Sequence, residues 1–409
     1  MSACAGCGAA PLVPVFSLGR MPPVNAFVTP AEAAREESFP LDVHLCPACT
    51  LLQLHPTVAP ARLFADYTYL SATSRTTVAY LGRLAESLAV KLALTTSSKI
   101  LEIGSNDGTL LAALRAFSPG VLGIDPAENV AARANADGIP TRVAFFSAAV
   151  AAALRVEVGA FDLVAALNVV AHTPDFVDLL AGVHALLAPG GTFVMECVHV
   201  MQTILRGAID TVYHEHVYCF SLHALVRAYA RVGLVIVDVE TTRAQGGSLR
   251  VFARAAADAP AVAASVADLL RVEEEAGVTR LETYAAVGQL AETLRREVPA
   301  RLRALRGDAR LVVGLGASAR GVVLLNHCGL GPDDLDFVVD DTPLKQGKLV
   351  PGRHIPVHDW TRIPRGEEVV CLLLSWNYRD EVLAKLRART SHARVLVPLP
   401  VLEEITLES

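Results

Sequence analysis

The sequence predicts an α/β protein with two parallel-sheet units that follow a small cysteine-containing module. Two Cys-x-x-Cys pairs lie in the first 60 residues, and short apolar runs alternate with helical segments twice, from residue 99 and again from residue 310. Such alternation is typical of parallel sheets that are covered by helices on both faces. The chain has 409 residues, which is long enough for two or three domains.

The composition is that of a globular protein without a strongly basic surface. Hydrophobic residues make up 52% of the chain, charged residues make up 19%, and the formal net charge is -6. This balance argues against extended disorder, and against nucleic-acid binding, which needs cationic side chains for the phosphate backbone. The first ten residues lack a cationic region followed by an apolar stretch. We therefore expect a cytoplasmic protein that does not bind membranes, and its oligomeric state stays open, with a monomer as one alternative.

The two cysteine pairs predict a structural zinc site in a domain formed by residues 1–60. Cys4 and Cys7 form the first pair, and Cys46 and Cys49 form the second. Four thiolates bind one tetrahedral zinc ion and leave no open coordination position, which disfavours a catalytic metal. The ion would stabilise a module with little core of its own. The alternative is a set of reduced, partly buried thiols.

The first α/β unit is expected over residues 61–258. An amphipathic helical pattern spans 62–95, apart from Tyr67 and Tyr69, which lie just before the helix. Two further strands are expected to form an antiparallel edge that completes a seven-stranded sheet. The parallel strands are predicted at 99–103, 120–124, 141–145, 161–167 and 191–196, and the edge strands at 234–239 and 248–253.

A long helix and a smaller α/β unit are expected to complete the chain. The segment 261–305 has a helical pattern and lies within a connector of residues 259–308. Residues 309–409 then form the second unit. Its strands are predicted at 311–314, 337–340, 369–374 and 394–397.

The strand and glycine turn that begin the first α/β unit predict a site for S-adenosylmethionine. The turn at Gly104 opens a helix, so the backbone can approach a ligand closely. The full Gly-x-Gly-x-x-Gly set of a dinucleotide site is missing. Glu102 and Asp107 would repel a pyrophosphate but favour the cationic sulfonium and amino groups of the methyl donor. Asp125, at the end of the next strand, can accept hydrogen bonds from ribose hydroxyls.

Two asparagines are assigned to the same cofactor site. Asn106 lies in the glycine turn, and Asn168 follows the fourth strand, whose end faces the same cleft. The alternatives are a nicotinamide-binding Rossmann domain and a degenerate domain that binds no cofactor.

Titratable side chains are concentrated after the fifth strand. Tyr213, Glu215 and His216 lie within four residues, and His172 follows the fourth strand. Methyl transfer to carbon first requires removal of a proton, and imidazole is suited to that task near neutral pH. His216 is our candidate base beside a ketone, Glu215 orients or polarises the local network, and His172 or a tyrosine stabilises the enolate oxygen.

Other interpretations of these residues stay open. His214 and His216 have the spacing of a metal-binding pair, as in a zinc-dependent hydrolase, and buried histidines often only satisfy backbone groups. For Tyr213, Tyr67 and His172 taken singly, packing or substrate positioning is as good an explanation as a chemical role.

Several motifs in one order resemble the sugar C-methyltransferase family of antibiotic biosynthesis, whose members methylate a ketosugar carried on thymidine diphosphate. The likeness covers nearly the whole chain and implies a class I Rossmann-like S-adenosylmethionine methyltransferase core, a small N-terminal zinc-binding domain and a second, C-terminal Rossmann-like domain. Besides the motifs above, it includes Gln245-Gly-Gly-Ser-Leu-Arg250, Gly314-Leu-Gly-Ala-Ser-Ala-Arg320, Asn326-His-Cys-Gly329, Asp341-Thr-Pro-Leu-Lys-Gln346 and Ser375-Trp-Asn377.

The resemblance also implies roles for individual residues. It makes His216 the general base, with Glu215, His172 and Tyr67 near the substrate, and it puts the nucleotide between the central and C-terminal domains. Leu315 stands where the family usually has tyrosine, which leaves the nucleotide carrier open. The residues assigned to the nucleotide sugar are Gly314, Gly316, Ser318, Arg320, Asn326, Lys345 and Gln346.

These inferences predict an S-adenosylmethionine-dependent C-methyltransferase that acts on a dTDP-linked 4-keto-deoxysugar. The base is expected to form an enolate beside the C4 ketone, and carbon C3 is our first choice for the methylated position. Methylation at C5, methylation of oxygen or nitrogen on a nucleotide sugar, and non-catalytic binding of a sugar nucleotide are the alternatives.

Overall fold

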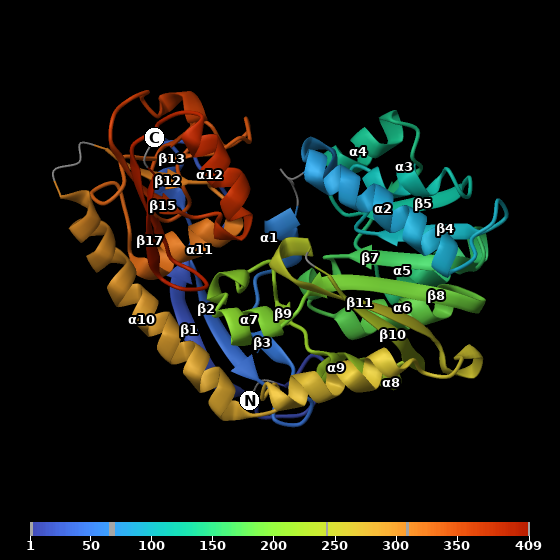
Figure 1. The fold of residues 1–409 in the computed structure, drawn as a ribbon. Coiled ribbons are helices and arrows are strands. Elements are labelled where there is room, and N and C mark those ends of the chain that lie inside the picture. Colours follow the sequence, from blue (N-terminus) through green and yellow to red (C-terminus); the bar gives the residue numbers. More distant parts are fainter. Residues whose placement is uncertain (1–2, 65–69, 243, 308–310, 408–409) are drawn as a thin grey trace.

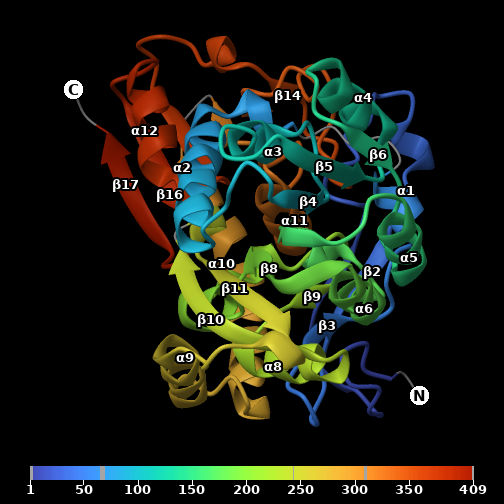
Figure 2. The same ribbon diagram turned by 90° about the vertical axis from the view of Figure 1, so that its right-hand side faces the viewer.

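The computed structural model describes residues 3–64, 70–242, 244–307 and 311–407, and it contains three β-sheets. In Figure 1 the central sheet and its helices form one lobe and the C-terminal sheet forms a second lobe. The N-terminal strands lie between the two lobes at their base, and a long helix runs diagonally along them. Figure 2, turned by 90°, shows the stacked layers of the central lobe from its side.

The central sheet has seven strands in the order β10-β11-β8-β7-β4-β5-β6. Neighbouring strands from β8 to β6 pair in parallel, whereas β11 is antiparallel to both β8 and β10. This is the predicted sheet, including its antiparallel edge. The strands are β4 (Lys99–Ile103), β5 (Gly120–Asp125), β6 (Thr141–Val143), β7 (Phe161–Leu167), β8 (Leu187–Val198), β10 (Leu234–Thr242) and β11 (Ser248–Ala255).

Helices cover both faces of the central sheet, as its apolar strands require. Alternate residues of a strand point to opposite faces, and accordingly Ile100 packs in one apolar cluster and Leu101 in another. Ile100 shares its cluster with Leu84 of α2, whereas Leu101 shares its cluster with Leu180 of α6. The helices of this lobe are α2 (Arg75–Lys91), α3 (Thr109–Leu114), α4 (Glu128–Ala136), α5 (Ala148–Glu157), α6 (Phe176–Leu186), α7 (Met201–Arg206) and α8 (Leu222–Arg231).

The C-terminal sheet has six strands in the order β14-β13-β12-β15-β16-β17. All of its pairs are parallel except β16 with β17. The two outer strands were not predicted, because β14 has two residues and β17 is a short edge strand that begins with two glutamates. The elements are β12 (Val312–Leu315), α11 (Ala319–Cys328), β13 (Phe337–Val339), β14 (Val357–His358), β15 (Val369–Leu373), α12 (Arg379–Arg387), β16 (Ala393–Val397) and β17 (Glu403–Leu407).

The first 60 residues connect the two lobes. Their strands β1 (Val13–Met21), β2 (Phe39–Leu45) and β3 (Leu52–Leu54) form a sheet with β9 (Tyr218–Cys219), which comes from the central part of the chain. Met21 belongs to the apolar core of the C-terminal lobe, whereas Leu51 belongs to a core of the central lobe. Apolar side chains of the N-terminal module therefore belong to the hydrophobic cores of both lobes.

The prediction of one continuous helix over 261–305 was wrong. The segment forms α9 (Ala264–Glu275) and α10 (Leu281–Arg306), with Gly277 between them at a φ of +81°. This left-handed conformation ends a helix and is open to glycine, since a Cβ at this position would lie 2.4 Å from Oγ1 of Thr283. The break lets α9 pack on the central lobe while α10 packs on β1 and α11.

The helical pattern predicted over 62–95 is also divided. A short helix, α1 (Pro60–Phe64), and a 3₁₀ turn, η2 (Ser71–Thr73), precede α2. The side chain of Ser74 caps α2 by accepting a hydrogen bond from the amide of Thr77. Tyr67 and Tyr69 lie outside the described residues.

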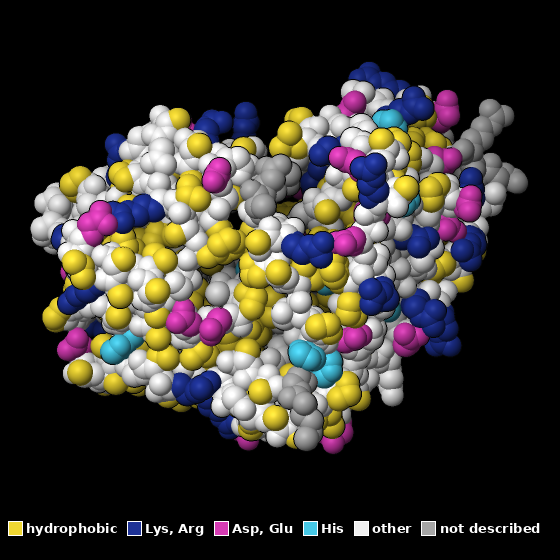
Figure 3. All heavy atoms as spheres, turned by 180° about the vertical axis from the view of Figure 1, so that it is seen from behind, with side chains coloured by type: hydrophobic (Ala, Val, Ile, Leu, Met, Phe, Trp, Pro, Cys, Tyr) yellow, Lys and Arg dark blue, Asp and Glu magenta, His cyan; other side chains and the backbone are white. Residues whose placement is uncertain are grey.

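The face seen in Figure 3 has a mixed surface, with basic and acidic side chains interspersed and hydrophobic side chains gathered across the middle. The surface is notched between the two lobes at the top of this view. Within the described ranges, no helix is both long enough and apolar enough to cross a membrane.

The carboxylate of Glu273 links the helical connector to the central lobe by hydrogen bonds. Glu273 of α9 is fully buried and accepts hydrogen bonds from the backbone amides of Leu222 and His223, at the start of α8. Its oxygens also contact Nε2 of His199 at 2.6 Å and Nδ1 of His223 at 2.8 Å. A carboxylate at a helix N-terminus is favoured by the helix dipole as well as by these hydrogen bonds.

We predict that Glu273→Ala lowers the free energy of unfolding by about 3 kcal/mol, because it leaves several buried donors without an acceptor. Urea unfolding followed by circular dichroism measures the change. Glu274→Ala, at the exposed neighbouring position, is the matched control and should leave the midpoint unchanged. Equal stability of the two variants would contradict this role of Glu273.

Candidate active site

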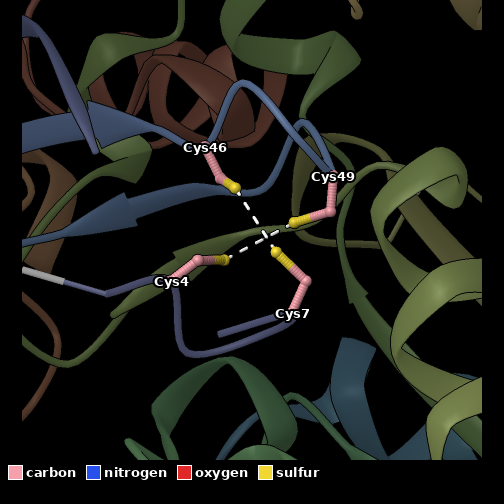
Figure 4. A group of neighbouring side chains, drawn as sticks. All are labelled: Cys4, Cys7, Cys46 and Cys49. Atoms are coloured by element: carbon pink, nitrogen blue, oxygen red, sulfur yellow. Dashed lines mark hydrogen bonds between the residues drawn. The ribbon is translucent and has the colours of Figure 1, made fainter. Parts of the chain in front are cut away.

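The four N-terminal cysteines converge on one point (Figure 4). The Sγ atoms of Cys4 and Cys49 lie 3.5 Å apart, as do those of Cys7 and Cys46, and all four lie within 4.8 Å of one another. A tetrahedral zinc ion with zinc–sulfur bonds of about 2.3 Å holds its sulfurs roughly 3.8 Å apart. The donor set and its spacing therefore fit structural zinc, and no other group of three or more His, Cys, Asp or Glu side chains in the described ranges has metal-binding geometry.

Helix α8 holds both cysteine turns. The guanidinium of Arg231 donates to the carbonyl of Gly6, and that of Arg227 donates to the carbonyl of Ala48. Helix α8 also follows the histidine-rich segment (residues 213–216), from which only β9 and its flanking residues separate it, so the zinc module and this segment share one support. The other four cysteines, Cys197, Cys219, Cys328 and Cys371, are free and lie within the two lobes.

A cleft of about 1810 Å³ lies between the two lobes. Its lining comes from the N-terminal module, the central lobe and the C-terminal lobe, so it is large enough for more than one small molecule. Two glycine turns face it, one at Gly104 after β4 and the other at Gly316 after β12. These are the carboxyl ends of parallel strands, where open α/β sheets bind their ligands.

The cofactor turn has the geometry that its sequence predicts. Gly104 and Asn106 both have positive φ angles, and the amide of Asn106 donates to Asp125 at 2.9 Å. Glu102 is buried at the end of β4, and its Oε2 has no hydrogen-bond partner among the described residues. Burial and the nearby charges of Asp125 and Asp107 raise the pKa of Glu102 well above its usual value. A cationic ligand would relieve this repulsion, so the turn fits the positively charged methyl donor better than a pyrophosphate.

Five of the six predicted cofactor residues line the cleft: Glu102, Gly104, Asn106, Asp125 and Asn168. Asp107, the sixth, does not line it. Its carboxylate accepts hydrogen bonds from Oγ1 of Thr109 and from the amide of Ala72 in η2. Asp107 thus ties the turn to the side chain of Thr109 at the start of α3 and to the backbone of η2.

The histidine-rich segment places His216 at the cleft. Nδ1 of His216 lies 2.8 Å from the carbonyl oxygen of Thr211, and Nε2 lies 2.8 Å from the hydroxyl of Tyr213. A carbonyl only accepts hydrogen bonds, so Nδ1 carries the proton and Nε2 carries the lone pair. Burial lowers the pKa of His216 to about 4, with a further contribution from the charge of Arg320, so the imidazole is neutral at pH 7.

Glu215 and His172 lie beside this imidazole. The ring centroids of His172 and His216 are 4.9 Å apart, and Phe64 stacks on the other side of His172. Glu215 accepts a hydrogen bond of 2.7 Å from the side chain of Asn25, in the N-terminal module. Burial raises the pKa of Glu215 to about 7, although Asn25 and the charge of Lys345 oppose the rise. A neutral imidazole and a carboxyl group that titrates near neutrality form a base and an acid in one cleft.

His214 points away from this cleft. Its Nε2 lies 3.3 Å from the carbonyl of Phe39, and its ring packs edge-on against the ring of Phe39. His214 and His216 therefore do not converge on a shared metal ion, which removes the main support for a zinc-dependent hydrolase.

Four of the seven residues predicted to bind the nucleotide sugar line the cleft: Gly316, Ser318, Arg320 and Lys345. The other three have different contacts. Gly314 lies within β12, where a Cβ would come 2.9 Å from Leu374 and Val338. Asn326 donates to the carbonyls of Val322 and Pro351, and Gln346 donates to the carbonyl of Asp340.

Comparisons with known proteins agree with the geometry. Models described as a zinc binding domain, a methyltransferase domain and a C-methyltransferase C-terminal domain match residues 4–64, 77–239 and 243–400. The C-methyltransferase NovU from Streptomyces niveus is 34% identical over 408 residues, a match that covers 99% of this chain and 97% of NovU. The chain belongs to the S-adenosylmethionine-dependent C-methyltransferases.

Two solved methyltransferase structures each match less than half of this chain. Magnesium protoporphyrin IX methyltransferase from Synechocystis PCC 6803 with bound SAH is 14% identical, and its TM-score is 0.34. The match covers 43% of this chain and 82% of that one. An S-adenosylmethionine-dependent methyltransferase from Anabaena variabilis is also 14% identical, and its TM-score is 0.35. The match covers 42% of this chain and 83% of that one.

Several residues of this C-methyltransferase that shape the site were not predicted from the sequence. Asn25 holds Glu215, and Tyr80 forms a hydrogen-bonded network with Glu196 and Arg250 at the edge of the cleft. Arg250 belongs to a motif that the resemblance includes, which was the available signal. Asn25 has no comparable signal, because a lone asparagine in a proline-rich stretch is typical of a turn.

Zinc removal should destabilise more than the first 60 residues, because their core is shared with both lobes. We predict that Cys46→Ser reduces bound zinc from about one ion per chain to near zero and lowers the free energy of unfolding by several kcal/mol. Metal analysis and urea unfolding measure the two effects. Cys371→Ser, at a buried thiol remote from the cluster, is the control and should retain zinc.

The turn at Gly104 gives a second prediction. A Cβ on Gly104 would lie 2.2 Å from Cγ2 of Val169, and the residue has a φ of +67°. Gly104→Ala should therefore weaken S-adenosylmethionine binding about tenfold or more, measured by calorimetry. Gly82→Ala, in α2 where a Cβ meets no atom within 4 Å, should bind the cofactor normally. Unchanged affinity of Gly104→Ala would exclude this turn as the cofactor site.

Proposed function

We propose that this C-methyltransferase methylates a dTDP-linked 4-keto-deoxysugar at C3. The observation that carries the proposal is the neutral His216 imidazole in a cleft shared by the cofactor turn and the glycine turn of the C-terminal lobe. A cleft with a base between two ligand-binding turns suits a reaction in which the acceptor is held by one lobe and the methyl donor by the other.

His216 acts as the base in this proposal. Its Nε2 takes the proton from C3, either directly or through the Tyr213 hydroxyl that already hydrogen-bonds to it. The electron pair of the C–H bond becomes the enolate, and the C3 carbon then forms a bond to the methyl group as the bond from that group to sulfur breaks. S-adenosylmethionine supplies the electrophilic methyl group, and the proton leaves His216 for solvent after product release.

Glu215 and His172 support the enolate. In its protonated form Glu215 donates a hydrogen bond to the C4 oxygen, where negative charge develops. Its pKa of about 7 keeps a large protonated fraction available near neutral pH. Burial and the adjacent His216 lower the pKa of His172 well below its usual value, so this ring is neutral and polarises the site without a charge.

The C-terminal lobe binds the nucleotide in this proposal. Ser318, Arg320 and Lys345 line its side of the cleft at the start of α11, whose N-terminus favours phosphate. The amides of Gly316 and Ala317 already donate to Val339 and Asp340, so the phosphate contacts fall to side chains and to later amides of the turn. Tyr67 is proposed to contact the sugar, although it lies outside the described residues.

The proposed setting is deoxysugar formation for an antibiotic, in line with the sugar C-methyltransferases that the motifs resemble. We place the enzyme in the cytoplasm, where thiols stay reduced and available to zinc. A monomer already contains every residue that the proposed reaction uses.

The base assignment predicts the behaviour of His216→Asn. This variant should lose exchange of the C3 hydrogen with deuterated water and slow methyl transfer by about 100- to 10,000-fold, while it still binds S-adenosylmethionine. Proton NMR of the sugar measures the exchange. Tyr213→Phe retains exchange if the proton passes directly to Nε2 and loses it if the hydroxyl relays it; exchange that persists in His216→Asn contradicts the assignment.

The shifted pKa values of His216 and Glu215 also predict how the reaction rate depends on pH. The kcat/KM should rise as pH increases through about 4, where His216 becomes neutral, and fall above about 7, where Glu215 loses its proton. Glu215→Gln keeps a hydrogen-bond donor at all pH values, so it should remove the upper limb. An upper limb that survives in Glu215→Gln would assign that limb to another group.

A further inference from the structure

A buried carboxylate joins the C-terminal lobe to the segment that carries the base. Asp210 is completely buried. Its Oδ1 accepts a hydrogen bond of 2.8 Å from Arg320, and its Oδ2 accepts one of 2.6 Å from the indole N–H of Trp376. The Arg320 guanidinium also stacks over the Trp376 ring at 4.4 Å from the centroid. Because each oxygen of the Asp210 carboxylate accepts a hydrogen bond from a different side chain, the contact is geometrically specific as well as strong.

The residue after Asp210 holds the base. Asp210 and Thr211 lie in one 3₁₀ turn, η4 (Ile209–Thr211), and the carbonyl of Thr211 accepts the proton of His216 Nδ1. The Thr211 hydroxyl donates to the carbonyl of Ala208, which closes the turn from the other side. Asp210 is thus the contact through which the C-terminal lobe reaches the Thr211 carbonyl.

We propose that Asp210 is a positioning residue: its bonds to Arg320 and Trp376 hold η4 where the Thr211 carbonyl fixes His216 in the tautomer whose Nε2 carries the lone pair. The proposal rests on the assignment of His216 as the base. It gives the C-terminal lobe a part in catalysis besides substrate binding, since two of its side chains orient the base without touching the reacting atoms. A base held in the wrong tautomer presents an N–H to the substrate and cannot remove its proton.

The charges of the Asp210–Arg320 ion pair matter as well as its geometry. Several groups face His216: Tyr213 from its own segment, His172 from η3 (Val170–His172), and Arg320 from α11, while Glu215 lines the same cleft. A small cavity beside the ring adds His199, Cys197, Tyr218 and Cys219. Asp210 neutralises Arg320, so its carboxylate limits the electrostatic effect of the guanidinium on the base.

The variant Asp210→Asn tests the proposal, because it keeps the size of the side chain and removes its charge. Nitrogen-15 NMR of histidine-labelled protein reports which ring nitrogen carries the proton, and His216→Asn identifies the signal. The wild type should show the Nδ1–H tautomer alone, and Asp210→Asn should show a mixture of the two tautomers. This readout needs no substrate, so it decides the inference even if every ketosugar proves inactive.

Kinetics give the second readout. With an accepted ketosugar, Asp210→Asn should lower kcat about 100-fold and leave the KM values for both substrates and the unfolding midpoint within about twofold of the wild type. Asp268→Asn makes the same chemical change at an exposed position of α9 that does not line the cleft, and should behave as the wild type. A wild-type enzyme that is inactive with every ketosugar counts against the proposed function and leaves the tautomer result standing.

Other outcomes would overturn the proposal. A single Nδ1–H tautomer together with normal kcat in Asp210→Asn would show that the pair does not act on the base. A parallel loss of cofactor affinity, kcat and stability would show a purely structural role. If Asp210→Asn fails to fold, Trp376→Phe removes one of the two bonds without changing any charge, and an unaltered tautomer in that variant would also reject the proposal.

Discussion

The hydrogen bond from His216 to the Thr211 carbonyl is the interaction on which the rest of the site depends. It assigns the proton to Nδ1, so Nε2 carries the lone pair that accepts a hydrogen bond from the Tyr213 hydroxyl. The segment that makes this bond has little regular structure of its own, and neighbours from all three parts of the chain hold it. Asn25 of the N-terminal module contacts Glu215, Arg320 and Trp376 of the C-terminal lobe contact Asp210, and His172 of the central lobe packs on the imidazole.

This arrangement explains why a methyltransferase lobe carries two additional units. The seven-stranded sheet alone provides the glycine turn and the carboxylate of Glu102, the proposed site of the cationic cofactor, but it does not complete the environment of the proposed base. The zinc module has a core that depends on its neighbours, and arginines of α8 bind both of its cysteine turns. The ion therefore stabilises a connection between two lobes rather than an isolated domain.

Local patterns predicted most of the fold, and long-range contacts account for what was missed. Apolar strands, the turn at Gly104 and the paired cysteines are each encoded within a few residues. By contrast, Asn25 and Glu215 are separated by 190 positions, and Trp376 and Asp210 by 166, so nothing near either residue signals the contact. Asp107 differs from its predicted role for a local reason, because its carboxylate already accepts hydrogen bonds from the Thr109 hydroxyl and the Ala72 amide. The helix break at Gly277 was within reach of sequence analysis, since an interior glycine weakens a helix.

The central claim is that the base acts on a carbon beside the ketone of a nucleotide-linked sugar, and the product of one turnover tests it most directly. Dideoxy ketosugars carried on thymidine diphosphate would be incubated with S-adenosylmethionine that bears a carbon-13 methyl group, and the product examined by heteronuclear NMR. The account predicts that the labelled methyl protons correlate with C3 and with the C4 carbonyl. Correlation with C5, or a methyl signal in the range of O-methyl or N-methyl groups, would contradict it.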